Sequence, residues 1–296
     1  MQYNLFFAFT PLHLKIINSI PKKGNSILII LSNNNLDKFC NSYIDVDSFC
    51  HIHTYQAKFF NPIELIKINF RYKKINRIYI GNFKFFNFRL IDFFINYRDL
   101  ITFDDGVGGV TGAYFNLNNT SMKERAYRIF NLDIGTIIKK HKFHYGIYNL
   151  NSNIFNNNIK SLILDNIDKK FNYNGNVLLT TDKSEAGTLS QEDERELLEK
   201  IIKNLNIKYI LHHPSKKFNI NILDTKIIDE PYLSDDIVCN SSFNHVYSLS
   251  ASSVLGVIQL DFFPEKYITY LANKDAPVMI MLRLHTNINC INFEDL

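Results

Sequence analysis

Tryptophan is absent from this chain of 296 residues, so 25 phenylalanines and 16 tyrosines supply its large aromatic side chains. Also missing is any apolar run of the roughly 18 residues that a membrane-spanning helix requires. The N-terminal stretch 1–9 is apolar, but it is short, lacks a charged n-region and is followed by Pro11. We therefore predict a soluble or peripheral protein with neither a signal peptide nor a transmembrane helix.

Cysteine is sparse, and no Cys-x-x-Cys pair occurs among Cys40, Cys50, Cys239 and Cys290. Scattered cysteines in a long chain are typical of reduced thiols in a cytoplasm rather than of a disulfide framework. Two of them lie near His51 and His53, but the spacing matches no common zinc motif. The two histidines alternate along an expected strand, so they can simply share one of its faces.

A strong charge of either sign is also lacking, since the formal net charge is +4. This value is too small to indicate nucleic-acid binding, and it fits an anionic ligand or an anionic membrane surface equally well. The contents of 46% hydrophobic and 21% charged residues are those of an ordinary globular protein. Because 296 residues exceed what one core usually holds, we expect two domains.

The first half of the chain alternates between apolar strand patterns and helical stretches. Strands are predicted at 3–9, 26–31, 51–55, 77–80 and 100–103. Helices are predicted to begin at Thr10-Pro11 and at Pro62, because Thr favours the N-cap and Pro the first helical position. A further aromatic-rich helix is predicted at 85–96. Such alternation is typical of a parallel, doubly wound α/β sheet.

The middle of the chain differs in composition, and the alternation then resumes. The stretch 114–174 is rich in Asn, Lys and Ile, with a predicted helix at 123–130 and a predicted exposed loop at 151–158. We place the domain boundary near 172–176, which gives a first domain of 1–172, with a helical middle segment at about 114–172, and a second domain of 173–296. Further strands are predicted at 177–180, 209–211, 226–228, 246–249 and 278–284, and helices are predicted after the N-caps Ser190 and Ser234. Two doubly wound domains facing each other would form a central cleft.

Four polar loops follow predicted strands, at the edge where open α/β sheets place their ligand sites. Their polar residues are Asp104-Asp105-Gly106, Asp182, His212-His213-Pro214, and Ser250 with Ser252 and Ser253. Pro214 cannot continue a strand, so His213 would stand at the mouth of a crevice. An imidazole there, with cations close behind, could protonate or hydrogen-bond a departing phosphate. Serine hydroxyls at a helix start could bind the same phosphate.

Each of these loops also has a purely structural explanation. Asp-Asp-Gly is most often a turn, Asp182 can cap one, and serines before an apolar run are most often helix caps. Two further motifs are weaker still. Asp45 and Asp47 have the spacing of carboxylates that hold a metal on nucleotide-sugars, but no further oxygen ligands lie nearby. The glycine-rich stretch 106–112 lacks the spacing of the dinucleotide fingerprint, so we predict a mobile loop.

Taken together, the motifs resemble those of bacterial sialyltransferases, in particular the lipooligosaccharide sialyltransferases of glycosyltransferase family 52. The motifs that carry the resemblance are Phe9-Thr10-Pro11-Leu12, Arg77-Ile78-Tyr79, Thr102-Phe103-Asp104-Asp105-Gly106, the stretch 178–183, His213-Pro214 and a serine motif. The sequence departs from the family pattern at His13, where Gln is expected, and in the serine motif Ser-Ala-Ser-Ser.

The resemblance implies a GT-B fold, an inverting transfer of sialic acid from CMP-sialic acid to a galactose-terminated glycan or glycolipid, and no metal or other cofactor. It also implies a cytoplasmic enzyme that can lie on the inner face of the bacterial inner membrane, and some members form dimers that exchange helices of the middle segment. The substrate-binding residues would be Thr10, Pro11, Asp104, Gly106, His212, Pro214, Ser250, Ser252 and Ser253. His213 would assist the departure of CMP.

The general base has two candidates, Asp182 and Asp105, both at predicted strand ends. The resemblance to the lipooligosaccharide family favours Asp182, whereas related families use the second acidic residue of the Asp-Asp-Gly motif. Lys183 would hold Asp182 ionised, so that it is available as a base at neutral pH. Two alternatives stay open: a GT-B transferase that uses another nucleotide-sugar, and a nucleotide- or glycan-binding module without turnover.

Overall fold

The computed structural model describes residues 1–32, 36–56, 61–81, 86–104, 127–129, 136, 139–147, 158–181, 189–213, 225–249, 267–272 and 288–292. The chain divides into two compact units, Met1–Asp165 and Asn166–Leu296. The sequence had suggested a division after residue 172. In the part of the chain that the structure describes, no helix combines the length and apolar character needed to cross a membrane.

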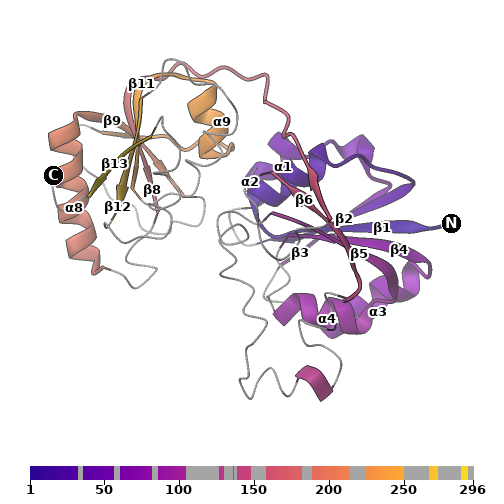
Figure 1. Cartoon of the computed structure of the whole chain (residues 1–296). Helices are drawn as coiled ribbons and strands as arrows, with labels where there is room; N and C mark the ends of the chain where they lie inside the picture. The colour runs from indigo at the N-terminus through magenta and orange to yellow at the C-terminus, as the bar shows by residue number, and fades with distance from the viewer. Residues whose placement is uncertain are drawn as a thin grey trace. The chain divides into compact units, whose positions relative to one another are not determined.

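Unit 1 is built on a seven-stranded parallel sheet with the strand order β3-β2-β1-β4-β5-β6-β7 (Figure 1). The strands are β1 (Tyr3–Ala8), β2 (Asn25–Ser32), β3 (His51–Gln56), β4 (Ile75–Ile80), β5 (Tyr97–Phe103), β6 (His141–Gly146) and β7 (Ile159–Ser161). The strand order reverses at β1, so the chain winds outward from the centre of the sheet in both directions, as in a Rossmann fold.

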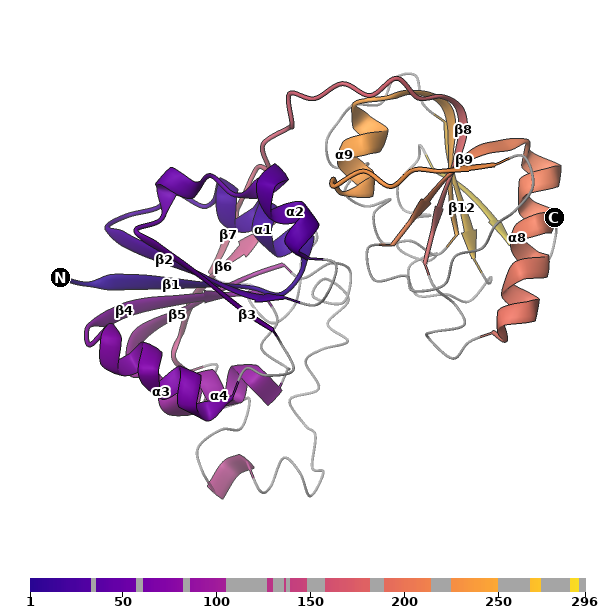
Figure 2. The ribbon, with the colours of Figure 1, turned by 180° about the vertical axis from the view of Figure 1, so that it is seen from behind.

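Helices cover both faces of this sheet. Helices α1 (Pro11–Ser19) and α2 (Asp37–Tyr43) lie on one face, and α3 (Pro62–Arg71) and α4 (Phe86–Phe94) lie on the other (Figures 1 and 2). A short 3₁₀ turn, η1 (Val46–Ser48), precedes β3. The predicted helix starts are confirmed: Thr10 and Asn61 cap α1 and α3, each followed by a proline whose missing N–H is not needed there.

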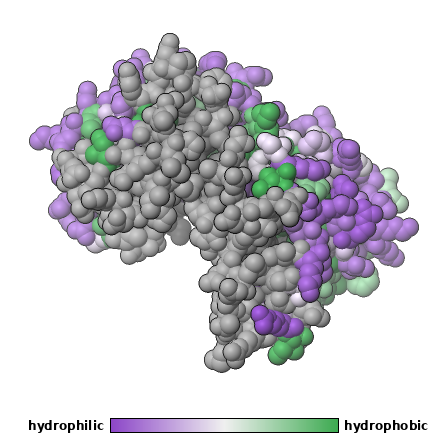
Figure 3. Space-filling view, in the orientation of Figure 1, coloured by the Kyte–Doolittle hydropathy of each residue, from purple (hydrophilic) through white to green (hydrophobic). Residues whose placement is uncertain are grey.

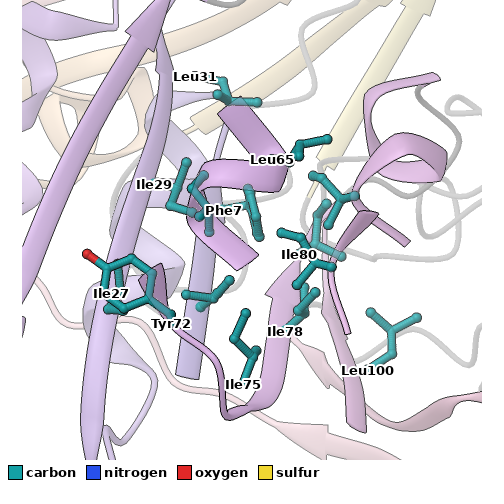
Figure 4. Packing of buried hydrophobic residues seen from close by; sticks show 14 residues of the cluster. Phe7, Ile27, Ile29, Leu31, Leu65, Tyr72, Ile75, Ile78, Ile80 and Leu100 are labelled. Atoms are coloured by element: carbon teal, nitrogen blue, oxygen red, sulfur yellow. The ribbon is translucent and has the colours of Figure 1, made fainter. Parts of the chain in front are cut away.

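The core of unit 1 is a layer of aliphatic side chains between the sheet and the pair α3 and α4 (Figure 4). Phe7, Ile29 and Ile80 are fully buried in the central strands, and Leu65 reaches them from α3. The strands read as nearly continuous apolar runs because helices cover both of their faces. This packing fixes where each strand ends, and therefore where the polar loops begin.

Unit 2 repeats the same plan with a six-stranded parallel sheet in the order β10-β9-β8-β11-β12-β13. Its strands are β8 (Asn174–Thr180), β9 (Ile207–His212), β10 (Lys226–Ile227), β11 (Ser242–Leu249), β12 (Tyr267–Ala272) and β13 (Ile288–Asn292). Helices α8 (Gln191–Leu205) and α9 (Ser234–Cys239) lie on opposite sides of the sheet (Figures 1 and 2). Ser190 caps α8 in a reciprocal capping box with Asp193, as its position in the sequence predicts.

Several elements differ from the sequence prediction. The middle segment, predicted to be helical, contributes β6 and β7 to the first sheet. β6 reads His-Lys-Phe-His-Tyr-Gly, and its buried histidine carries no apolar signal. Helix α2 and strands β12 and β13 were not predicted, and helix α9 has Leu233 rather than Ser234 as its N-cap. The predicted strand at 278–284 lies outside the described residues, as do 151–157 of the predicted loop and most of the helix predicted at 123–130.

Candidate active site

Three of the polar loops predicted from sequence leave unit 2 at neighbouring strand ends. Thr180, the last residue of β8, is in register with His212 of β9 on one side and with Leu249 of β11 on the other. Because all three strands are parallel, their carboxyl ends lie at the same edge of the sheet. The loops that contain Asp182, His213 and Ser250 therefore begin side by side.

Hydrogen bonds tie these three strand ends together. The His213 N–H donates to the Thr180 carbonyl at 3.0 Å, and the Thr180 hydroxyl lies 2.7 Å from Nδ1 of His212. On the other side of β8, the Thr181 hydroxyl donates to the Leu249 carbonyl at 3.4 Å. Thr180 and Thr181, which the sequence analysis did not single out, thus connect the ends of β9 and β11 to the end of β8. Their position as a pair of threonines at the end of an apolar strand is the sequence signal that could have revealed them.

The position of β8 in the sheet indicates where a ligand is expected to bind. The strand order reverses between β8 and β11, and ligands of open α/β sheets bind beyond the carboxyl ends of the strands at such a reversal. Asp182 follows Thr181 directly, and Ser250 follows Leu249 directly. Asp182, Pro214, Ser250, Ser252 and Ser253 themselves lie outside the described residues, so their side-chain roles remain predictions.

His213 is the one predicted catalytic residue whose surroundings are described. His213 is exposed at its strand end, but the protein atoms around it partly desolvate its imidazole and lower its pKa below the ordinary value, since a desolvated ring resists protonation. At neutral pH the ring is therefore mostly uncharged before a ligand arrives. A phosphate bound next to it would favour the charged form and raise its pKa again. The site is thus suited to take up a proton together with an anion.

Asp104 in unit 1 is buried, and its carboxylate binds other parts of the protein. Oδ1 lies 2.9 Å from Nε2 of His144 on β6, and Oδ2 accepts the Ile147 N–H at 2.7 Å. Its own N–H donates to the Tyr145 carbonyl at 3.2 Å. These contacts clamp the end of β5 to β6. These contacts position the start of the loop that carries Asp105, and the predicted contact of Asp104 with substrate stays a prediction. Asp105 and Gly106 lie outside the described residues.

The clamp continues through a chain of buried polar groups. The Thr102 hydroxyl lies 2.8 Å from Nδ1 of His144 and 2.9 Å from Nε2 of His141. With one proton on His144 Nε2, directed at Asp104, the hydroxyl donates to His144 and accepts from His141. Burial, with a smaller effect of the neighbouring His144, lowers the pKa of His141 to about 4, so this ring is neutral at pH 7. Sequence analysis missed both histidines because their strand was not recognised.

Removing the Asp104 carboxylate should destabilise the protein. Asp104→Ala leaves the buried His144 Nε2–H and Ile147 N–H without their acceptor, and each orphaned donor costs about 1–3 kcal/mol. We expect the free energy of unfolding to fall by about 2–4 kcal/mol in a urea titration. The exposed Asp47→Ala serves as the control and should stay within about 0.5 kcal/mol of the wild type. Equal stability of Asp104→Ala and wild type would contradict the clamp.

At the carboxyl end of β1, where the strand order of unit 1 reverses, Thr10 and Pro11 begin α1. The Thr10 hydroxyl accepts the His13 N–H at 3.2 Å, so it serves the helix as an N-cap. His13 is fully buried, and its Nδ1 accepts the Phe9 N–H at 3.2 Å. A Cβ atom at Gly81 would lie 2.5 Å from Nε2 of His13, so this imidazole requires glycine at the end of β4. The substitution of His for Gln is thus accommodated by packing.

The candidate metal motif at Asp45 and Asp47 has a local structural role. The Asp45 carboxylate accepts the Asp47 N–H at 3.2 Å and the Ser48 hydroxyl, and so caps the turn η1. His53, from the other cluster considered, lies on β3 with its Nε2 2.7 Å from the Tyr72 hydroxyl. Among the residues that the structure describes, no group of three or more His, Cys, Asp or Glu side chains is arranged to hold a metal ion.

Two Rossmann-like units in one chain, with both sheets reversing strand order at their first strand, define the GT-B class of proteins. Solved structures agree with this class. The structure is similar to the glycotransferase of kitacinnamycin, with a TM-score of 0.56, 7% identity and coverage of 99% of this chain and 87% of the other. It is also similar to UDP-GlcNAc 2-epimerase from Methanocaldococcus jannaschii, with a TM-score of 0.50, 12% identity and coverage of 99% and 89%.

Sequence comparison identifies the family. The profile of glycosyltransferase family 52 matches residues 28–275, which is most of the chain. The protein therefore belongs to glycosyltransferase family 52, and it is a glycosyltransferase with the GT-B fold. The resemblance seen in its motifs is thereby confirmed.

Two named relatives resemble the chain along most of its length. The first is the CMP-N-acetylneuraminate:beta-galactoside alpha-2,3-sialyltransferase of Pasteurella multocida, 26% identical over 86% of this chain and 87% of the relative. The second is the N-acetyllactosaminide alpha-2,3-sialyltransferase of Neisseria meningitidis, 26% identical over 79% of this chain and 68% of the relative.

Proposed function

We propose that the protein is an inverting sialyltransferase that moves sialic acid from CMP-sialic acid to a terminal galactoside of lipooligosaccharide or a related glycan. The observation that carries this proposal is the row of strand ends in unit 2, which starts the loops of Asp182, His213 and Ser250 side by side at the point where the strand order reverses. The name of the Pasteurella relative supports the donor and the β-galactoside acceptor, the name of the Neisseria relative supports an N-acetyllactosaminide acceptor, and both names favour an α-2,3 linkage.

The proposed reaction is a single displacement at the anomeric carbon of sialic acid. The acceptor hydroxyl oxygen forms a bond to that carbon while the bond from the carbon to the phosphate oxygen of CMP breaks. The electron pair of the broken bond leaves with the phosphate, and a carboxylate takes the proton of the acceptor hydroxyl. The configuration inverts because attack and departure occur on opposite faces. Asp182 is the favoured base, and Asp105 is the alternative.

His213 would stabilise the departing phosphate. It stands at the end of β9 next to β8, and its backbone N–H donates to the Thr180 carbonyl, which fixes the main chain from which the ring extends. A neutral ring can donate a hydrogen bond, and a ring protonated on donor binding can transfer a proton to the phosphate oxygen. Serine hydroxyls from the loop after β11 would add further donors. We assign CMP binding to unit 2 and acceptor binding to unit 1.

CMP binding tests the proposed donor site. Ser252→Ala/Ser253→Ala should weaken CMP binding, because hydrogen bonds to a charged phosphate contribute about 1.5–3 kcal/mol each. We expect at least a tenfold rise in the dissociation constant by calorimetry, which corresponds to about 1.4 kcal/mol. Ser242→Ala on β11, at an exposed position at the other end of the strand, is the matched control. An unchanged CMP affinity in the double variant would remove the serine loop from the site.

The proposed reaction needs no metal, because CMP is already a good leaving group and His213 with the serines supplies stabilisation. Transfer at an undiminished rate in EDTA is the expected result. Complete loss of activity in EDTA, restored by Mn²⁺, would contradict it.

A further inference from the structure

Helix α3 of unit 1 carries an apolar stripe on its outer side. Ile63, Ile66 and Phe70 are 62%, 37% and 69% exposed. Their spacing of three and four residues puts them on one face of the helix. The opposite face buries Leu65 and Ile68 against the sheet. A surface helix normally turns polar residues to the solvent, whereas this helix is apolar on two faces.

The neighbouring helix α4 also exposes a large apolar side chain. Phe93 of α4 is 53% exposed. The Asn96 N–H, just beyond α4, donates to the Asn69 side chain of α3 at 3.1 Å, which joins the two helices next to Phe70. We call Ile63, Ile66, Phe70 and Phe93 the α3 surface. In the space-filling view, purple hydrophilic side chains cover much of the coloured surface of unit 1, with smaller green apolar areas between them (Figure 3).

Cations accompany these apolar residues. Between positions 62 and 74 the chain has four basic residues, Lys67, Arg71, Lys73 and Lys74, and one acidic residue, Glu64. All four basic residues are exposed. Lys67 pairs with Glu64 at 2.8 Å, and Arg71, Lys73 and Lys74 follow at the C-terminal end of the helix. The segment therefore combines protruding apolar side chains with a net positive charge.

We propose that the α3 surface docks the protein on an anionic lipid bilayer. Helices that lie in a membrane interface insert Phe, Leu or Ile side chains between lipids and direct Lys and Arg at the anionic headgroups. Each basic residue close to such a surface adds to the electrostatic attraction, and added salt weakens this attraction by screening it. A peripheral contact of this kind would hold the enzyme where glycolipid acceptors are found, but the inference itself does not depend on the sugar donor.

Other occupants fit the α3 surface less well. In a two-fold contact between copies of the chain, two surfaces of the same net positive charge would face each other, which is unfavourable. The phosphates of a nucleic acid would pair with the cations. They would, however, place negative charge against the apolar side chains of the α3 surface, which have no favourable contact with it. A bilayer accepts both parts of the surface, since it offers anionic headgroups above apolar chains.

Flotation of the full chain with vesicles tests the proposal. Wild type should float with vesicles of phosphatidylglycerol and phosphatidylcholine, much less with phosphatidylcholine alone, and less in about 1 M NaCl than in about 0.1 M. Ile63→Ser/Phe70→Ser should lower the partition coefficient at least tenfold, because the lost apolar burial of two side chains exceeds that factor. The control Val46→Ser/Ile163→Ser changes two residues that are 64% and 85% exposed but lie off α3, and it should bind as wild type does.

Equal unfolding temperatures of the three proteins would show that the fold is kept, as expected for exposed positions. Flotation of Ile63→Ser/Phe70→Ser at the wild-type level, or no vesicle binding by wild type, would overturn the proposal. So would sedimentation that shows a wild-type dimer converted to a monomer by the double substitution, with vesicle binding unchanged. That last result would assign the α3 surface to a second copy of the chain.

Discussion

Asp182→Asn should lower kcat by a factor on the order of 10²–10⁴ while CMP affinity stays within about twofold of wild type. The asparagine keeps the shape of the side chain but cannot take the proton of the acceptor hydroxyl. Asp182 is favoured because it leaves the end of β8, the strand that also aligns His213 and the serine loop. Lys183 beside it would keep the carboxylate ionised at neutral pH. Fixed-time transfer assays measure the change in kcat, and calorimetry with CMP measures the change in affinity.

Asp105→Asn is the matched comparison for this prediction. Asp105 follows Asp104, which is clamped to His144 and Ile147, so its loop starts from a fixed point in unit 1. β5 is, however, one strand removed from the reversal of strand order in its sheet. We expect Asp105→Asn to change KM more than kcat. If Asp182→Asn stays active and Asp105→Asn does not, the two carboxylates have the reverse roles.

His213→Ala should also lower kcat by a factor on the order of 10²–10⁴, with the acceptor KM changed much less. The proposed contact is made to the leaving phosphate and strengthens in the transition state, and such a loss appears in kcat. The backbone contact of His213 with the Thr180 carbonyl survives the substitution, so the strand ends should stay in place. Normal turnover with poor acceptor binding would contradict the role.

The pH dependence of CMP binding gives an independent readout of His213. Partial desolvation lowers the pKa of the free imidazole, and a bound phosphate would raise it, so binding would take up a proton between the two pKa values. As the pH falls through the interval between the lowered pKa of the free ring and its raised pKa in the complex, wild-type affinity should therefore increase relative to His213→Asn, which cannot titrate. CMP itself titrates in this range in both proteins, so the difference between the two profiles isolates the histidine. Parallel profiles would exclude proton uptake by this residue.

The fold could be predicted from the sequence where apolar strands and helix caps were explicit. β1, β2, β4, β8 and β9 are apolar runs, and Thr10, Pro62 and Ser190 mark helix starts, so the doubly wound plan followed from local patterns. β6 escaped prediction because its inward side chains include His144, whose burial depends on a partner 40 residues away, Asp104. Local sequence cannot reveal such a long-range pair.

The candidate site also has features that could be predicted from the sequence and features that could not. The loops after β8, β9 and β11 could be predicted individually, since polar residues at strand ends are visible in the sequence. Their placement at one edge of the sheet also followed from the strand-helix alternation, but which of the strands are neighbours could not be predicted, because it depends on which strands pair and in what register. The contacts of Asp104 with His144 and Ile147 could not be predicted for the same reason, because they depend on the pairing of β5 with β6.

The central claim, sialyl transfer from CMP-sialic acid, is tested most directly by the product. The purified chain is incubated with lactose as the β-galactoside and either CMP-sialic acid, UDP-galactose or UDP-N-acetylglucosamine, and the sugars formed are identified by mass spectrometry. The account predicts sialyl-lactose and an equal amount of released CMP with the first donor, and no lactose-derived product with the other two. A glycosylated lactose formed from a UDP-sugar, with none formed from CMP-sialic acid, would contradict it.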